Sequence, residues 1–191
     1  MSETTDWAAA ISRQREQKDE FYAEHPHSPL PPDHRDGFDG LSYFEPDPDL
    51  RFVLPLVEDP ERETITVETT TEGAREYYRW GEFRFEVDGA EQSLQAYKAE
   101  PGEGRLWVPF RDATSGEATY GAGRYLDLEA EEDRTADGEW VLDFNRAYNP
   151  YCAYSDQYEC PLIPMENWLD VPIEAGEKAY EPPEGATSHA H

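Results

Sequence analysis

The sequence has little lysine, little cysteine and no long apolar run, and each shortage excludes something. Its three lysines are Lys18, Lys98 and Lys178, against 43 acidic residues, and the 191-residue chain carries a formal charge of −27. A chain of this charge repels polyanions, so we expect neither nucleic acid nor a membrane as a partner. No apolar run approaches the ~20 residues of a membrane span. Because no basic segment followed by an apolar core suggests a secretory signal either, we expect a cytoplasmic protein.

The acidic excess also indicates the environment. Charges of one sign repel each other in dilute buffer, and salt screens that repulsion. Acidic chains are often disordered, but five Trp, twelve Tyr and eight Phe favour a packed core. The composition therefore favours a folded protein of a salt-rich cytoplasm. We expect a single domain over residues 1–180 and a disordered tail over 181–191.

Two cysteines do not make a disulfide framework. Seven residues separate Cys152 from Cys160, and a disulfide closing so short a loop adds ~2–3 kcal/mol in the chain-entropy model. A reducing cytoplasm opposes that bond, and no histidine stands at a spacing typical of zinc sites. A thiol nucleophile needs a histidine or another cation nearby, and Arg146 is only a weak candidate. We therefore expect two buried thiols and no metal.

Motifs for catalysis and for cofactors are also lacking. No histidine lies between His34 and the tail residues His189 and His191, so Asp112 and Ser115 lack a partner to complete a triad. The G-x-G at 121–123 lies within an expected strand and does not precede a helix, so it is not a phosphate loop. The sequence thus predicts no cofactor and leaves a reaction open.

Alternation of apolar and polar residues predicts an all-β fold, with about seven or eight antiparallel strands in a barrel or sandwich. A slip in phase at Gly81 predicts a β-bulge, and Asp88-Gly89 predicts a hairpin turn. One helix is expected at about 6–24, with Asp6 as its N-cap and its end before Pro26. The expected strands lie at 51–57, 64–70, 77–87, 93–98, 105–110, 118–128 and 140–144.

The longest stretch without a strong acidic excess, Leu106–Tyr125, is interpreted as a central hairpin. Asp112–Gly116 has the composition of a turn. If that turn centres near Thr114, Val108 faces Tyr120 and Leu106 faces Ala122, with their side chains on one apolar face. The same register places Arg124 on the apolar face. Pairing 121–128 with the last strand then brings it opposite Phe144.

Three long blocks resemble domain-of-unknown-function family 1684: P-F-R-D-A-T-S-G-E-A-T-Y-G-A-G-R-Y at 109–125, L-D-F-N-R-A-Y-N-P-Y-C-A-Y at 142–154 and C-P-L-I-P-M-E-N-W-L-D-V-P-I-E-A-G-E-K at 160–178. The segments S-P-L-P-P at 28–32 and G-L-S-Y-F at 40–44 are similar to the front end of shorter, haloarchaeal-type members. Members usually carry a proline where this chain has Tyr151. The resemblance implies that these blocks belong to one domain, and it implies no reaction.

An arginine on an apolar face needs a carboxylate, carbonyl groups or a ligand anion beside it. The predicted register gathers several polar side chains at the Arg124 end, and it places Asp112, Thr114 and Ser115 about ten residues away, roughly 30 Å along a straight strand. Residues 104–125 also carry a net charge of +1. We therefore predict a pocket for a compact anionic metabolite, walled by Arg105, Arg124, Asn145, Arg146, Tyr148, Asn149 and Tyr154. The alternative for Arg124 is a buried structural ion pair.

The aromatic segment 145–168 leaves a second function open. It holds four tyrosines and both cysteines, and loops of this length in a compact domain are often functional. It either closes one end of the fold or serves as the contact surface of a non-catalytic interaction module. A concave pocket favours ligand binding, and a flat exposed aromatic patch favours interaction. The oligomeric state stays open.

Overall fold

The structure is a computed structural model, and it describes residues 2–155 and 158–181. The expected tail therefore lies outside the described residues from position 182 on. The helices are α1 (Ser2–Glu24) and α2 (Pro32–Arg35), with 3-10 helices η1 (Pro48–Leu50), η2 (Phe144–Arg146), η3 (Tyr151–Ala153) and η4 (Met165–Asn167). The strands are β1 (Arg51–Leu54), β2 (Val57–Glu58), β3 (Thr64–Glu68), β4 (Ala74–Val87), β5 (Ala90–Lys98), β6 (Arg105–Phe110), β7 (Arg124–Glu129) and β8 (Trp140–Asp143).

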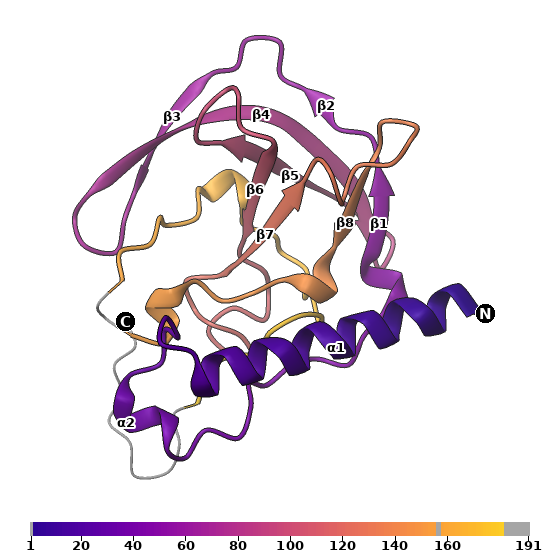
Figure 1. Cartoon of the computed structure of the whole chain (residues 1–191). Coiled ribbons are helices and arrows are strands. Elements are labelled where there is room, and N and C mark those ends of the chain that lie inside the picture. Colours follow the sequence, from indigo (N-terminus) through magenta and orange to yellow (C-terminus); the bar gives the residue numbers. More distant parts are fainter. Residues whose placement is uncertain (1, 156–157, 182–191) are drawn as a thin grey trace.

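These strands form two antiparallel sheets, which confirms the predicted all-β class as a sandwich-like arrangement rather than a closed barrel. The larger sheet has the order β2-β4-β5-β6-β7, with β3 also paired to β4, and the smaller one consists of β1 and β8. Figure 1 shows β4 curving over β5, β6 and β7 while α1 crosses the opposite end of the molecule. The aromatic segment 145–168 lies between the curve of β4 and helix α1.

The predicted bulge and hairpin turn in the long strand β4 are confirmed. The β4–β5 register shifts between Arg79 and Gly81. A Cβ at Gly81 would lie 2.7 Å from Cγ of Leu56, so glycine lets the chain leading into β2 approach closely. Asp88 and Gly89 both have positive φ, 52° and 82°, as a two-residue turn into β5 requires.

The register of the central hairpin differs from the predicted one. Leu106 faces Leu128 and Val108 faces Leu126, so the strand that returns is displaced by six residues. The reason is the connection, because residues 111–123 form a compact loop and not the end of a strand. Within that loop the amide of Gly116 donates to the carbonyl of Thr119 at 3.0 Å.

Gly123 is the last residue of this loop, directly before β7 begins at Arg124. Its φ is +102°, and a Cβ there would lie 2.2 Å from Cδ1 of Ile163 and 2.6 Å from the carbonyl oxygen of Phe110. Only a glycine fits such a conformation at such close contact. The expectation that Gly121 and Gly123 lie inside a strand is therefore wrong.

The last strand also has another partner than expected. β8 pairs with β1, Arg51 facing Asp143 and Leu54 facing Trp140, rather than with β7. The stretch expected as one strand at 51–57 breaks at Pro55, and its two parts join different sheets. Both sheets then bury their apolar faces in one core, made chiefly of Phe83, Phe85, Leu94, Leu106, Val108, Phe110, Leu126, Leu128, Leu142 and Phe144.

Helix α1 ends at Glu24 as predicted but begins at Ser2, so Asp6 lies inside it and is not its N-cap. It is attached to the body by polar contacts as well as by the buried Ile11 and Tyr22. The Trp7 indole donates to Asp143 at 2.8 Å, and Arg15 donates to the carbonyl oxygen of Phe44 at 2.7 Å. The segment after α1 packs on the body, with Leu30 buried beside Tyr22.

Candidate functional site

Arg124 projects into the interior, as its position on the apolar face predicts, and its contacts are with the chain itself. Its side chain is 0% exposed. One Nη lies 3.4 Å from Oδ1 of Asp112 and donates to the carbonyl of Ile173 at 2.8 Å; the other donates to the carbonyls of Ala175 and Glu177. Burial lowers the pKa of Arg124, and Asp112 opposes that shift. This geometry matches the structural alternative, since Arg124 holds segment 173–177 against β7.

The separation expected between Arg124 and Asp112 is therefore wrong. The loop at 111–123 folds back, so Asp112 is the direct partner of the guanidinium rather than a residue some 30 Å away. Arg105, expected beside Arg124, lies at the other end of the same ladder, because it faces Glu129 whereas Arg124 faces Phe110. Five residues of strand place the two arginines roughly 17 Å apart.

Of the other five predicted residues, four make contacts within the protein away from Arg105, and one lies near it. Asn145 bonds to the backbone of Asp47 in both directions at 2.8 Å, and Arg146 pairs with Asp133 at 2.6 Å. Asn149 and Tyr154 are buried beside Glu177. Tyr148 alone of the seven lies in the same cavity as Arg105.

Glu177 is the centre of a buried polar cluster that the sequence did not indicate. It is 2% exposed, it accepts from the Tyr154 hydroxyl and from the backbone amide of Asn149, and it forms an ion pair with Lys18 of α1. Burial and the Glu177 carboxylate raise the pKa of Tyr154 well above its usual value, which keeps that hydroxyl a donor. The cluster fastens the helix to the body.

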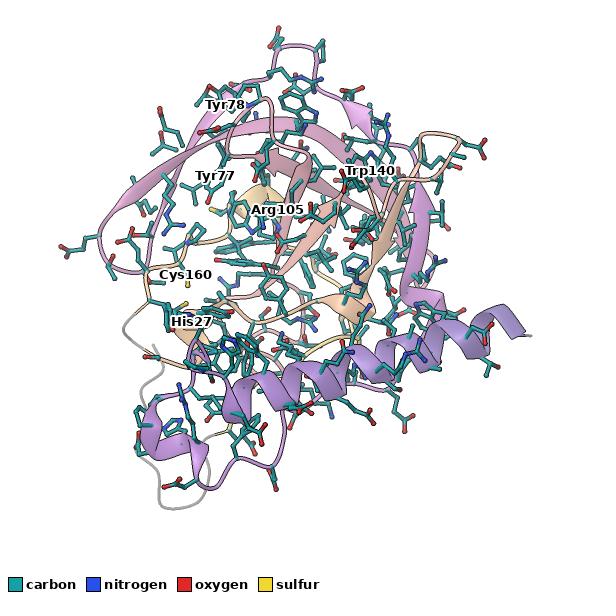
Figure 2. The ribbon with its side chains drawn as sticks, viewed as in Figure 1. His27, Tyr77, Tyr78, Arg105, Trp140 and Cys160 are labelled. Carbon is teal, nitrogen blue, oxygen red and sulfur yellow. The ribbon has the colours of Figure 1, made fainter. Side chains whose placement is uncertain are left out.

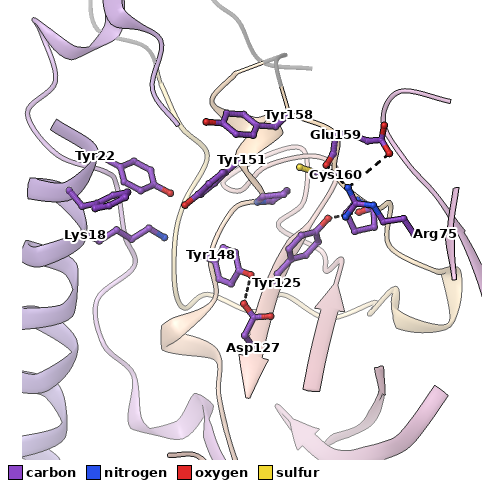
Figure 3. Close-up of a pocket in the computed structure, with 13 residues that line it drawn as sticks. Lys18, Tyr22, Arg75, Tyr125, Asp127, Tyr148, Tyr151, Tyr158, Glu159 and Cys160 are labelled. Carbon is purple, nitrogen blue, oxygen red and sulfur yellow. Dashed lines mark hydrogen bonds and ion pairs between the residues drawn. The ribbon is translucent and has the colours of Figure 1, made fainter. Parts of the chain in front are cut away.

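A cavity of about 540 Å³ lies next to this cluster. It is bounded by α1, β7, the start of β4 and two pieces of segment 145–168, and six of its thirteen lining residues are aromatic (Figure 3). The Tyr148 hydroxyl donates to Asp127 on its floor. The lining residues are Lys18, Phe21, Tyr22, Arg75, Tyr125, Asp127, Tyr148, Pro150, Tyr151, Tyr158, Glu159, Cys160 and Pro161.

Backbone hydrogen bonds position the two pieces of loop. Tyr125 and Tyr148 form a bridge in which each amide donates to the other carbonyl, at 2.8 and 3.0 Å. At the end of β3, the amide of Thr70 donates to the carbonyl of Cys160 at 3.0 Å. The loop is thus attached to both sides of the cavity, and the tyrosines take fixed places.

A second cavity of about 380 Å³ adjoins the first, and the two share Arg75, Tyr125, Asp127, Tyr148 and Pro161. The rest of its lining is Glu76, Tyr77, Ala99, Glu103, Arg105 and Trp107. Figure 2 shows Tyr77 and Arg105 beneath the curve of β4. We call the two cavities together the tyrosine groove.

Burial sets the protonation of the polar groups in the tyrosine groove. It raises the pKa of Tyr125 and Tyr148 far above the neutral range, so both stay neutral phenols. It also raises the pKa of Asp127, a shift that the hydrogen bond from Tyr148 opposes. Two guanidiniums, those of Arg75 and Arg105, also line the second cavity, and each lies beside a glutamate, Glu159 at 4.0 Å and Glu103 at 3.4 Å respectively.

The sequence missed Arg75, Lys18, Tyr22 and Tyr125 as members of one site. They come from β4, α1 and β7, which are distant along the chain, and no motif joins them. In the described ranges, no group of three or more His, Cys, Asp or Glu side chains is placed to hold a metal ion. No helix of residues 2–155 or 158–181 has both the length and the apolar character needed to cross a membrane.

The comparisons agree with the resemblance seen in the sequence. A family profile described as "Protein of unknown function (DUF1684)" matches residues 36–178. The chain is similar to an uncharacterised protein of Haloarcula marismortui with a solution NMR structure, at 42% identity and a TM-score of 0.71, over 93% of this chain and 96% of the other. No curated protein matches.

Proposed function

Because the chain belongs to the DUF1684 family, whose function is unknown, its role has to be inferred from its own side chains, and we propose that it binds a small organic anion with an aromatic or apolar body. The tyrosine groove is the binding site in this proposal. Its two cavities, of about 540 and 380 Å³, fall in the range typical of small-molecule sites. No reaction is part of the proposal.

The observation that carries the proposal is that two arginines, Arg75 and Arg105, line the same cavity. Their side chains are 44% and 50% exposed. Arg75 donates to the carbonyl of Glu159 at 3.1 Å, and Arg105 donates to Glu103 at 3.4 Å. A guanidinium has five N–H donors, so both arginines keep donors for a carboxylate or phosphate, which they can hold with paired hydrogen bonds.

The carboxylates of the groove limit where an anion can bind. Glu76, Glu103 and Asp127 line the same cavity as the two arginines, so a free anion is repelled over most of it. Of these, Asp127 has its pKa raised by burial, against the opposing hydrogen bond from Tyr148, and this shift reduces its negative charge. We therefore place the anionic group between the two guanidiniums and the body of the ligand in the larger cavity.

The aromatic walls support an aromatic or apolar body. Tyr125 and Tyr148 meet edge to face with their ring centroids 5.9 Å apart, and Tyr151 and Tyr158 do so at 5.1 Å. Rings held in this way present faces and edges to a planar ligand, and such contacts contribute about 0.5–1.5 kcal/mol each beyond the buried area.

The test uses phenylacetate and its neutral counterpart phenylacetamide as probes, with the shift of the melting temperature and calorimetric titration as readouts at molar salt. We expect phenylacetate to bind at least tenfold more tightly than the amide. Arg105→Gln and Arg75→Gln should each weaken the acid about tenfold or more, since hydrogen bonds to charged groups contribute about 1.5–3 kcal/mol. Arg84→Gln, on β4 outside the groove and 60% exposed, is the matched control. Equal binding of acid and amide, or an equal loss in the control, contradicts the proposal.

A second candidate, interaction with another protein, is favoured by one observation. Segment 145–168 keeps four large hydrophobic side chains in solvent: Tyr151 at 38%, Leu162 at 37%, Met165 at 75% and Trp168 at 46% exposed. Replacement of Met165 and Trp168 by serine should leave phenylacetate binding unchanged. If the parent retains a stoichiometric partner in pull-downs from the native host and the double variant does not, the result supports a role in protein interaction. If the parent retains no partner, that role is rejected.

We also propose that the protein works in the cytoplasm of a salt-loving cell. The formal charge of −27 and two free thiols support this placement. The similar protein of Haloarcula marismortui comes from such an organism. Fractionation of native cells followed by immunoblotting tests it, and recovery in the medium or the membrane fraction would reject it.

A further inference from the structure

Two thiols stand together at one wall of the tyrosine groove. Both Cys152 and Cys160 are free. Cys160 lines the larger cavity and is 7% exposed, whereas Cys152 lies behind it at 1%. The backbone amide of Cys152 donates to Sγ of Cys160 at 3.4 Å, and the two side chains also hydrogen-bond to each other. Any reagent in the cavity therefore meets Cys160 first and has Cys152 next to it.

The surroundings of Cys160 favour its thiolate. Hydrogen bonds from Cys152, partly offset by burial, lower the pKa of Cys160 to about 7, and the nearby Arg75 guanidinium acts in the same direction. The same contact and burial raise the pKa of Cys152, which stays a thiol. The Tyr120 hydroxyl lies 3.6 Å from Sγ of Cys152. At neutral pH the pair thus consists of one partly ionised sulfur on the cavity and one protonated sulfur behind it.

We propose that Cys160 is a hydroperoxide-reactive thiolate with Cys152 as its resolving thiol, so that the tyrosine groove contains a reversible oxidation site. Four features combine in this assignment. Cys160 faces a cavity large enough for a small peroxide, its sulfur receives hydrogen bonds, a guanidinium stands near, and a second thiol touches it. The inference does not depend on the anion proposed above, because neither Cys160 nor Cys152 has a part in holding it.

The proposed oxidation of the two cysteines takes two steps. Sγ of Cys160 attacks one oxygen of the hydroperoxide; the O–O bond breaks, an S–O bond forms, and the alkoxide takes a proton from water to leave as an alcohol. The sulfur of Cys152 then attacks the sulfenic sulfur of Cys160 and forms the S–S bond. Its proton leaves with the displaced hydroxide as water, so two electrons pass from the dithiol to the peroxide. A low-molecular-weight thiol reverses the change by thiol–disulfide exchange.

The experiment treats the folded full-length chain at molar salt with a small excess of hydrogen peroxide. We expect the intact mass to fall by two hydrogen atoms, with peptide mapping that joins Cys152 to Cys160, and recovery of the original mass on adding a thiol. In Cys152→Ser, dimedone should label Cys160 as a sulfenic acid. In Cys160→Ser, oxidation of Cys152 should be about tenfold or more slower. The pH profile of iodoacetamide labelling in the parent should rise through about 7 at Cys160.

Three results would overturn the assignment. In the first, peroxide leaves both thiols of the folded parent intact. In the second, Cys152 of the Cys160→Ser variant is oxidised at the parental rate. In the third, dimedone labels Cys152→Ser only after the protein is unfolded. Circular dichroism of both serine variants keeps the test interpretable if one of them folds poorly. In that case the iodoacetamide profile of the parent decides, because equal labelling rates at the two cysteines reject the proposal without any variant. Arg84→Gln, outside the groove, should oxidise as the parent does. Peroxide oxidation is measured without phenylacetate, so failure of this site is distinguishable from failure of anion binding.

Discussion

Arg124→Met is the substitution that tests the interior of this fold most directly. The change removes a guanidinium that is 0% exposed while it keeps an apolar chain beside Phe110, whose ring the guanidinium covers at 5.0 Å. The carbonyls of Ile173, Ala175 and Glu177 lose their donors. Asp112, also 0% exposed at its side chain, loses its counter-charge.

Breaking a buried pair by removing one partner costs about 3–5 kcal/mol. Asp112 keeps hydrogen bonds from the Thr114 hydroxyl at 2.7 Å and the Ile173 amide at 2.6 Å, which favours the lower end of that range. We therefore expect a loss of about 3 kcal/mol in the free energy of unfolding. For a domain of this size that corresponds to a melting temperature about 6–12 °C lower.

Urea unfolding at constant molar salt measures the loss, because urea adds no ions. The matched control is Arg84→Met, which removes an arginine that is 60% exposed and should stay within about 0.5 kcal/mol of the parent. Both variants should keep the parental m-value, so that the midpoint alone reports stability. If Arg124→Met loses no more than Arg84→Met, the structural role of Arg124 is wrong.

Three further outcomes follow from the fold. Gly123→Ala should lose about 2–4 kcal/mol in urea unfolding because of its positive φ and close contacts, whereas Gly121→Ala, with ordinary contacts, should stay near the parent. Burial raises the pKa of Asp127, so its contribution to stability is full below the ordinary carboxyl pKa and is lost as pH rises through the raised value. Asp127→Asn should therefore gain stability over the parent as pH rises from 4 to 7, and a constant difference contradicts this. The melting temperature should fall between molar and millimolar salt, because the 43 acidic residues far outnumber the 16 basic ones and the excess negative charges repel one another when unscreened, and an unchanged value contradicts that.

The fold class could be predicted from the sequence because alternation and turns are local signals. Gly81 marked the bulge and Asp88-Gly89 marked the hairpin, and both depend on a few neighbouring residues. The register of β6 and β7 depends instead on the shape of loop 111–123. Its internal hydrogen bonds, such as that from Gly116 to Thr119, have no counterpart in an alternation pattern. Because the predicted turn was centred too early, every predicted residue pair between β6 and β7 was displaced by the same six residues.

The candidate site could be predicted only in part for the same reason. Arg105 and Tyr148 were found as neighbours of one cavity, since charge and aromatic residues stand out in this acidic chain. Arg124 has the same local signal, yet its partner Asp112 comes from a loop whose course a pattern does not give. Arg75 and Lys18 carry no local signal at all, because their roles come from where β4 and α1 pack. Side chains that only the tertiary structure brings together cannot be predicted from their spacing in the sequence.

Helix α1 gives the tyrosine groove a wall that the matched family segment does not contain. The family profile begins at residue 36, whereas Lys18, Phe21 and Tyr22 come from the helix before it. The sheet and the loop at 145–168 therefore supply a half-open trough, and the helix closes it. In the binding proposed above, exchange of that one segment would alter which molecules are admitted, provided that the new helix keeps the buried contacts of Ile11 and Tyr22 and a cation for Glu177.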